Sequence, residues 1–211
     1  TMSVATNGAT IFFSTDGVTP NGNDNNTISN NNIGPAGANL PTKAILGNGS
    51  TTTTAIGNSG ILITNNNIFD FFGAAVTSSG IATNGGCNTW TITDNKFYQT
   101  ATRTWTGSAS HRPIDIGTST ATSGAQGFTI TGNTIGYASA AGTGTYTLTG
   151  STGKFIGIAF NGISGATVST ISNNTIASVS LTGVTSSGTS TSSPFTAILV
   201  TNGVANTNNN T

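Results

Sequence analysis

The chain has 211 residues with five Lys and Arg, five Asp, no Glu and a formal net charge of zero. Charged residues make up 5 % of it, against roughly 25 % in an ordinary globular domain, so a basic surface for nucleic acid or anionic membrane is excluded. No apolar run approaches the ~20 residues of a membrane span, and the abundant Thr, Ser, Asn and Gly are poor helix formers. The composition therefore predicts an all-β protein without a long α-helix.

A seven-residue phrase recurs along the chain, beginning at residues 27, 62, 91, 129 and 170: TISNNNI, LITNNNI, TITDNKF, TITGNTI and TISNNTI. Its second and seventh positions are hydrophobic, and its fifth is always Asn. The hydrophobic columns are Ile28, Ile63, Ile92, Ile130, Ile171 and then Ile33, Ile68, Phe97, Ile135, Ile176; the Asn column is Asn31, Asn66, Asn95, Asn133, Asn174 and Asn210. An apolar residue between two hydroxyl residues is typical of a strand with one buried face.

A second strand is predicted in each repeat, in the segments AILGNG, AAVTSS, IDIGTS, IAFNGI and ILVTNG that begin at residues 44, 74, 114, 158 and 198. Gly and Asn-Gly turn signals follow these segments. Neighbours in the Asn column lie 29 residues apart at the closest, from Asn66 to Asn95, and 41 at the widest, from Asn133 to Asn174. A fixed phrase with variable spacers indicates a stacked structure with loops of variable length, such as a surface loop at 185–194. The sequence thus predicts a parallel β-solenoid of about six rungs, with residues 1–211 forming one segment of a longer repeat protein.

The Asn column is predicted to form a ladder at one corner of the solenoid. Amide groups that turn inward at the same corner of every rung can hydrogen-bond along the stack and satisfy turn backbone that would otherwise be buried unpaired. Each bond contributes about 1 kcal/mol, whereas an unmade bond costs ~1–3 kcal/mol. Asp94 occupies the position before the column, where other repeats have Asn30, Asn65 and Asn173, and is interpreted as a turn residue.

The phrase resembles the repeat of right-handed parallel β-helix proteins, the pectate-lyase-like superfamily, and more narrowly the Thr/Asn/Gly-rich repeats of large secreted bacterial surface and adhesin-like proteins. The resemblance covers residues from about 25 to 211. It implies a right-handed coil, consistent with the handedness of parallel crossovers, and a secreted, extracellular or cell-surface location. The superfamily includes lyases, glycoside hydrolases, tailspikes and noncatalytic adhesins, so the resemblance leaves the activity open.

The densest polar group lies in the spacer and strand at 98–115. Its candidate ligand-contacting residues are Tyr98, Arg103, Trp105, His111, Arg112 and Asp115. Tyr98 or Trp105 could stack on a sugar while Arg103 or His111 donates hydrogen bonds. The favoured alternative is structural: Asp115 pairs with Arg112, and Trp105 covers the side of the coil.

Catalysis is disfavoured because glycoside hydrolysis needs two carboxyl groups within ~5–9.5 Å. The chain offers only Asp16, Asp24, Asp70, Asp94 and Asp115. A noncatalytic structural or adhesive segment is therefore the first hypothesis, and a carbohydrate-binding or polysaccharide-cleaving β-helix is the second. No cofactor and no metal site are expected, because one His and one Cys make a zinc site improbable, and Cys87 is interpreted as small core filler.

Two columns of hydroxyl residues flank the inward Ile and give a third hypothesis. They are Thr27, Thr91, Thr129, Thr170 and Ser29, Thr64, Thr93, Thr131, Ser172, with Leu62 interrupting the first column. This T-x-T array resembles ice-binding solenoids, although Thr is favoured on any exposed strand. Open solenoid ends expose unpaired strand edges, so the expected partners are further rungs of the same chain or other subunits, besides surface glycans; nucleic acid and membrane insertion are not expected.

Overall fold

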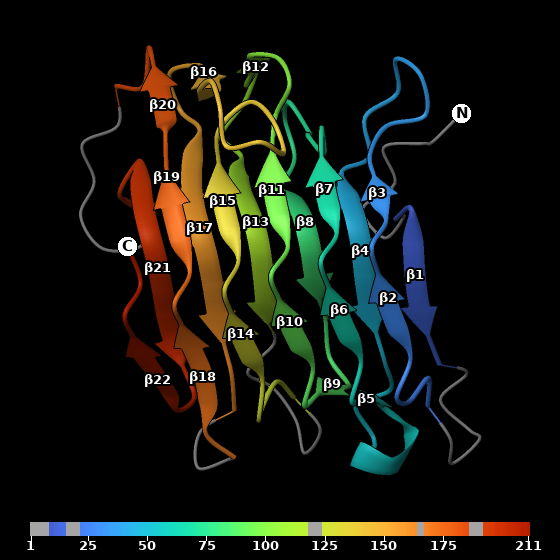
Figure 1. Ribbon diagram of the computed structural model, residues 1–211. Helices are drawn as coiled ribbons and strands as arrows, with labels where there is room; N and C mark the ends of the chain where they lie inside the picture. The colour runs from blue at the N-terminus through green and yellow to red at the C-terminus, as the bar shows by residue number, and fades with distance from the viewer. Residues whose placement is uncertain (1–8, 16–21, 118–123, 164–166, 186–191) are drawn as a thin grey trace.

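The computed structural model describes residues 9–15, 22–117, 124–163, 167–185 and 192–211. Its regular structure consists of short β-strands and a short 3-10 turn, η1 (Thr54–Ile56). Figure 1 shows the strands stacked in layers, with the chain advancing from one end of the stack to the other. Every strand pair is parallel and joins one rung to the next. The predicted parallel β-solenoid of six rungs without a long α-helix is confirmed.

Three long sheets form the walls of the solenoid. Sheet A contains β1 (Ile11–Ser14), β4 (Lys43–Asn48), β8 (Ser78–Thr83), β13 (Ser110–Gly117), β17 (Lys154–Asn161) and β21 (Phe195–Asn202). Sheet B contains β2 (Thr27–Ser29), β6 (Leu62–Thr64), β10 (Thr91–Thr93), β14 (Thr129–Thr131), β18 (Ser169–Ser172) and β22 (Ala205–Asn208). Sheet C contains β3 (Asn32–Ile33), β7 (Asn67–Phe69), β11 (Lys96–Tyr98), β15 (Thr134–Gly136) and β19 (Thr175–Ala177).

Two smaller sheets lie in the spacers between the walls. Sheet D contains β12 (Arg103–Thr104), β16 (Tyr146–Thr149) and β20 (Val179–Thr182), and sheet E contains β5 (Asn58–Ser59) and β9 (Cys87–Asn88). Among the described residues, the spacers hold additional strands only in some rungs, which is consistent with their variable length.

Isoleucine stacks fill the interior between the three walls. In sheet B, for example, Ile63, Ile92 and Ile130 are paired in register and have no exposed surface. Sheet A contributes a similar stack that includes Ile81 and Ile114. Burying such a side chain contributes about 1.5–3 kcal/mol, so the repeated Ile positions set the register of each new rung on the previous one.

One predicted strand was placed wrongly. The segment at 74–79 was expected to supply the sheet A strand of its repeat, but β8 begins at Ser78 and its register pairs Ile81 with Ile45 and Ile114. The stretch SSGIAT, followed by Asn84, is the true counterpart of the other sheet A segments. Its Ile81 is fully buried, whereas Ala75 is exposed, so burial of the β-branched residue decided the register.

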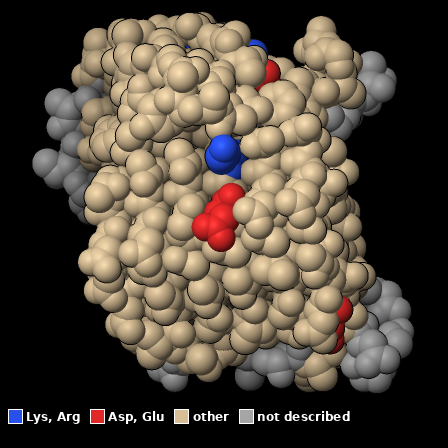
Figure 2. Space-filling model, in the orientation of Figure 1, with Lys and Arg blue, Asp and Glu red and all other residues tan. Residues whose placement is uncertain are grey.

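The outer surface carries few charges. Figure 2 shows one face of the solenoid with a single basic and a single acidic group near its centre and uncharged atoms over most of the rest. Within the described part of the chain, no helix has the length and apolar character needed to cross a membrane.

Candidate functional site

The invariant asparagines form a continuous hydrogen-bonded ladder at the corner between sheets B and C. In every step, the backbone N–H and the side-chain Nδ2 of one Asn donate to the Oδ1 of the Asn one rung later, over 2.9 to 3.3 Å. Each Nδ2 from the second rung onward also donates to an Ile carbonyl of the preceding rung. The members are Asn31, Asn66, Asn95, Asn133, Asn174 and Asn210. The ladder thus satisfies corner backbone that no sheet can reach.

The residue before each ladder Asn has left-handed backbone geometry. Asn30, Asn65, Asp94, Gly132, Asn173 and Asn209 all have φ between 51° and 69°. Only Gly, Asn and Asp adopt this conformation readily, which explains why these three residue types alternate at this position. Asp94 therefore occupies a conformational position shared by all six rungs.

His111 in β13 lies at the centre of a buried polar network. Its Nδ1 is 2.7 Å from the Ser78 hydroxyl, and its Nε2 is hydrogen-bonded to the Tyr146 hydroxyl. Phe71 stacks on the imidazole, with ring centroids 5.0 Å apart. All three polar side chains have no exposed surface, so solvent and substrate do not reach the serine hydroxyl in this structure.

The network continues outward to an ion pair at the edge of the core. Gln99 donates to the Tyr146 hydroxyl at 3.4 Å and accepts a hydrogen bond from Arg103 Nε at 2.7 Å. Arg103 pairs with Asp70 at 2.5 Å, and Asp70 also accepts hydrogen bonds from the backbone and hydroxyl of Thr100. Paired in this way, the partly buried Asp70 and Arg103 have little uncompensated charge.

Burial determines the protonation of the central groups. Burial, together with the smaller effect of the nearby Arg103 charge, lowers the pKa of His111 to about 3. Burial likewise raises the pKa of Tyr146 well above its ordinary value. Both side chains are therefore neutral at neutral pH, as expected for fully buried groups.

The other predicted ligand-contacting residues are distributed over the molecule. Trp105 is 4 % exposed and packs against Gly153, where an added Cβ would lie 2.0 Å from the indole ring. Arg112 pairs with Asp115 at 3.0 Å, and both line a cavity of about 380 Å³ on the outer face of sheet A. Tyr98 lies on sheet C. The structure therefore does not bring the six residues of 98–115 together in one groove.

Each described carboxylate has its own internal partner. Asp24 accepts hydrogen bonds from the backbone and hydroxyl of Ser59, and Asp94 accepts one from Thr93. With Asp70 and Asp115 this accounts for four of the five acids, each in a different rung, while Asp16 lies outside the described residues. No group of three or more His, Cys, Asp or Glu is placed to hold a metal ion in the ranges that the structure describes.

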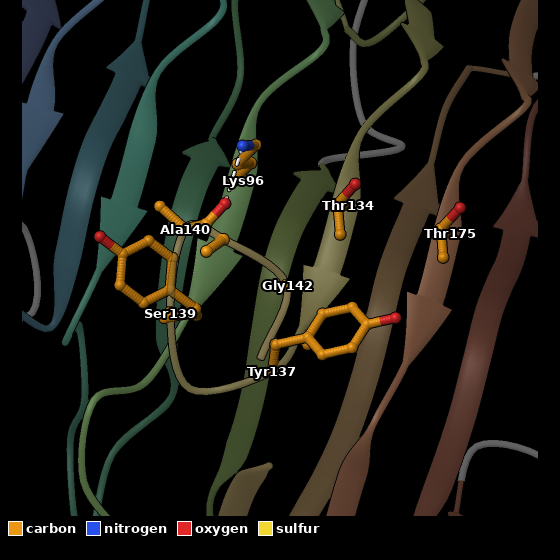
Figure 3. Close-up of a pocket in the computed structure, with 10 residues that line it drawn as sticks. Lys96, Thr134, Tyr137, Ser139, Ala140, Gly142 and Thr175 are labelled. Atoms are coloured by element: carbon orange, nitrogen blue, oxygen red, sulfur yellow. Dashed lines mark hydrogen bonds between the residues drawn. The ribbon is translucent and has the colours of Figure 1, made fainter. Parts of the chain in front are cut away.

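A groove that the sequence did not predict lies on the outer face of sheet C. It has a volume of about 290 Å³, and the loop 137–145 covers one side of it. Figure 3 shows Lys96, Thr134 and Thr175 in a row across three neighbouring strands, with the Tyr137 ring alongside. Pairing in register places these three side chains one strand spacing apart, about 4.8 Å. The groove thus presents an ammonium, two hydroxyls and an aromatic ring to solvent.

Hydrogen bonds fix the shape of this groove. Lys96 Nζ donates to the Ala140 carbonyl at 2.7 Å, and Ala138 N–H donates to the Thr143 carbonyl at 2.9 Å within the loop. Tyr98 also lines the groove and stacks on Phe69 with ring centroids 5.1 Å apart. The only sequence signal for the groove is the small-residue insertion YASAAGTGT, which makes this spacer the longest between ladder asparagines.

Sheet B presents the two hydroxyl columns of the repeat phrase on neighbouring strands. Thr91 pairs in register with Thr129 and Thr129 with Thr170, while Thr93, Thr131 and Ser172 align in the same way. All six side chains are partly exposed. Leu62 interrupts the first column in β6, and β22 carries Asn206 and Asn208 in place of hydroxyl residues.

Comparison with known proteins yields no match: no protein-family model fits the chain, and no curated protein or solved structure is significantly similar to it.

Proposed function

We propose that this chain is a noncatalytic structural and adhesive segment of a secreted bacterial cell-surface or extracellular fibre protein. The observation that carries the proposal is the unbroken asparagine ladder, which joins all six rungs through ten hydrogen bonds between consecutive asparagines. A stack held along its whole length by buried hydrogen bonds and Ile columns behaves as a stiff rod. The rod would display the outer faces of its sheets to solvent.

The distribution of polar groups supports a noncatalytic role. The described carboxylates bind Ser, Thr or Arg side chains of the same chain, and the Ser78, His111 and Tyr146 side chains are sealed in the core. A chain with so few charges also gains little from ion pairs that salt could screen. Stability that is indifferent to ionic strength suits a protein that works outside the cell.

Membership of the pectate-lyase-like superfamily is part of this proposal. Its support is the combination of three long parallel sheets with an Asn at the corner between the second and third wall of each rung. Secretion and a surface location come from the same resemblance.

We further propose that another rung covers the end of the stack beyond β21 and β22, supplied by the same chain or another subunit. Val200 and Val204 are 39 % and 44 % exposed there. Ile198, Val200 and Thr207 line an open cavity of about 460 Å³ at this end. An added rung would bury these side chains and pair the free strand edges.

Two measurements on the intact chain test the proposed rod: its stability against salt and proteases, and its cleavage activity toward polysaccharides. We expect the thermal midpoint to change little across NaCl concentrations that screen surface charge, and folded protein to resist proteases. Polysaccharides incubated with the chain, with and without Ca²⁺, should release no fragments. Release of fragments that stops with Asp115→Asn or Asp70→Asn would overturn the noncatalytic assignment.

Binding of ordered water or ice is a second candidate function, favoured by the register of the hydroxyl columns on sheet B. Its measurement is inhibition of ice recrystallisation by the intact chain. A Thr129→Lys variant should abolish inhibition, whereas Thr182→Lys on the exposed end of sheet D should retain it. Absence of inhibition by the unmodified chain excludes this candidate.

A further inference from the structure

We infer that Asn202 is a site of spontaneous covalent modification, at which the backbone nitrogen of Gly203 attacks the Asn202 side-chain amide and releases ammonia. The inference goes beyond the structural role proposed above and does not depend on it. It concerns the chemistry of one dipeptide at the end of β21.

Asn-Gly pairs occur at the ends of four sheet A strands in the part of the chain that the structure describes. The pairs are Asn48 with Gly49 at β4, Asn84 with Gly85 at β8, Asn161 with Gly162 at β17, and Asn202 with Gly203 at β21. Because glycine has no side chain, its backbone nitrogen is less shielded than that of any other residue. The pairs therefore share the same local chemistry, and differences in their reactivity have to come from the fold.

The fold holds the glycine nitrogens of these pairs in different ways. Gly49 N–H donates to the Gly85 carbonyl and Gly162 N–H donates to the Asn202 carbonyl, each at 2.9 Å and each one rung later. Gly203 N–H instead donates to the Oδ1 of Asn202, its neighbour in the chain, at 2.9 Å. The first two nitrogens are thus directed at the next rung, whereas the Gly203 nitrogen is directed at the amide that it would attack.

The geometry at Asn202 is close to that needed for ring closure. Oδ1 is bonded to Cγ, so a nitrogen 2.9 Å from Oδ1 lies near the carbon atom that it must reach. Reactions between groups held together in this way are strongly accelerated. Gly203 has φ 84°, and an added Cβ would lie 2.8 Å from the Gly162 Cα, so this backbone path requires glycine. Asn202 and Gly203 are both partly exposed, which gives water and hydroxide access.

The reaction needs only water. Hydroxide removes the Gly203 amide proton, and the nitrogen forms a bond with Asn202 Cγ. The bond between Cγ and Nδ2 then breaks, and Nδ2 takes up a proton from water and leaves as ammonia. Water opens the resulting five-membered succinimide at either of its carbonyl groups, which gives aspartate or isoaspartate at position 202. A neutral amide is thereby replaced by a carboxylate.

The product would change the end of the stack at which Figure 1 shows β21. Val200 and Val204, on either side of Asn202 in the chain, are 39 % and 44 % exposed. A carboxylate beside them is costly to bury, and isoaspartate lengthens the main chain, which disturbs strand register. Modification should therefore weaken the packing of a further rung; this consequence rests on the covering rung proposed above.

The experiment is incubation of the intact folded chain at mildly alkaline pH, followed by peptide mapping with mass spectrometry to detect the exchange of NH2 for OH. We expect Asn202 to convert about tenfold or more faster than Asn48 and Asn161. The Asn202 rate should rise with pH, since hydroxide removes the proton. In denaturant the three residues should convert at similar rates, because unfolding removes the difference in geometry.

Exposure alone makes the opposite prediction, because Asn48 is exposed and Asn202 only partly so. Conversion of Asn48 as fast as or faster than Asn202 in folded protein, or no conversion of Asn202, would overturn the inference. The measurement needs no second copy or added rung, so a failure of the modification is distinguishable from a failure of the covering rung.

Two variants test the assignment. Asn202→Gln should abolish conversion at position 202, because attack on the longer side chain has to form a six-membered ring. Asn161→Gln, on the neighbouring strand in register with Asn202, is the matched control and should leave the Asn202 rate unchanged. Circular dichroism checks that both variants are folded. Conversion at position 202 of Asn202→Gln at the original rate would refute attack by the Gly203 nitrogen.

Discussion

The Nδ2 of Asn95 lies 3.1 Å from the Oδ1 of Asn133, although the two residues are 38 positions apart in the chain. The same Nδ2 also donates to the Ile63 carbonyl of the preceding rung at 2.8 Å. One side chain thus connects three successive rungs, and the same connection recurs along the stack.

Replacing a central ladder residue should be strongly destabilising. In Asn95→Ala, the backbone N–H and Nδ2 of Asn66 lose their shared acceptor, and the Ile63 carbonyl loses its donor. Each buried group left unpaired costs ~1–3 kcal/mol, so the free energy of unfolding should fall by about 3 kcal/mol or more. Urea titration measures this free energy of unfolding. Asn32→Ala is the matched control, because it removes an exposed Asn that accepts a hydrogen bond from Asn67 in the next rung. This substitution should lower the free energy of unfolding by less than about 1 kcal/mol.

The corner before the ladder should tolerate only residues that accept left-handed geometry. Asp94 has φ 55°, and its counterpart Gly132 has φ 69°. Asp94→Gly and Asp94→Asn should change the free energy of unfolding by less than about 0.5 kcal/mol, whereas Asp94→Val should lower it by roughly 1–2 kcal/mol. A large loss in Asp94→Asn would show that the carboxylate itself is needed.

Stability should fall as the pH is lowered through the range set by His111. Its pKa in the folded protein is about 3, below the ~6.5 of an exposed imidazole. The unfolded chain therefore takes up a proton between these values while the folded protein does not, so folding weakens from about pH 6.5 downward. Each pKa unit between the folded and the unfolded value of His111 corresponds to about 1.4 kcal/mol of unfolding free energy.

Unfolding measured at intervals from pH 8 to pH 4.5 tests this dependence. His111→Gln keeps hydrogen-bonding capacity and removes the titration, so its unfolding free energy should vary much less with pH. The charged neighbours Asp70 and Arg103 are present in both proteins and cancel in the comparison. Parallel pH profiles for the two proteins would refute the assignment.

Cys87 should be unreactive in the folded protein. Its side chain is fully buried and in contact with Asn58 Nδ2 at 3.9 Å, and burial raises its pKa to about 11. Thiolate is the reactive form, so a thiol reagent at pH 8 should label Cys87 only in denaturant. The labelling rate would then report opening of rungs two and three. Rapid labelling of native protein would contradict the buried position.

The sequence by itself determined the architecture of the repeat. An Ile between hydroxyl residues, followed by a turn residue and an invariant Asn, specifies strand, corner and second strand through local rules of alternation and left-handed turns. Because the same phrase recurs, each rung can bury its Ile only against its own copy, which predicts parallel stacking. The strand at 78–83 was missed because two neighbouring segments of that repeat have similar apolar patterns, and only burial of Ile81 against Ile45 and Ile114 separates them.

Only the tertiary structure decided which polar residues are accessible. His111 and Arg112 are adjacent in sequence, yet one is sealed in the core by Phe71 and Tyr146 and the other lies at the surface. The groove on sheet C joins Lys96, Thr134 and Thr175, which lie in three successive rungs. Their proximity depends on the register of stacked rungs and on the path of the loop 137–145. Both are set by packing between residues distant in the chain, which no local pattern specifies.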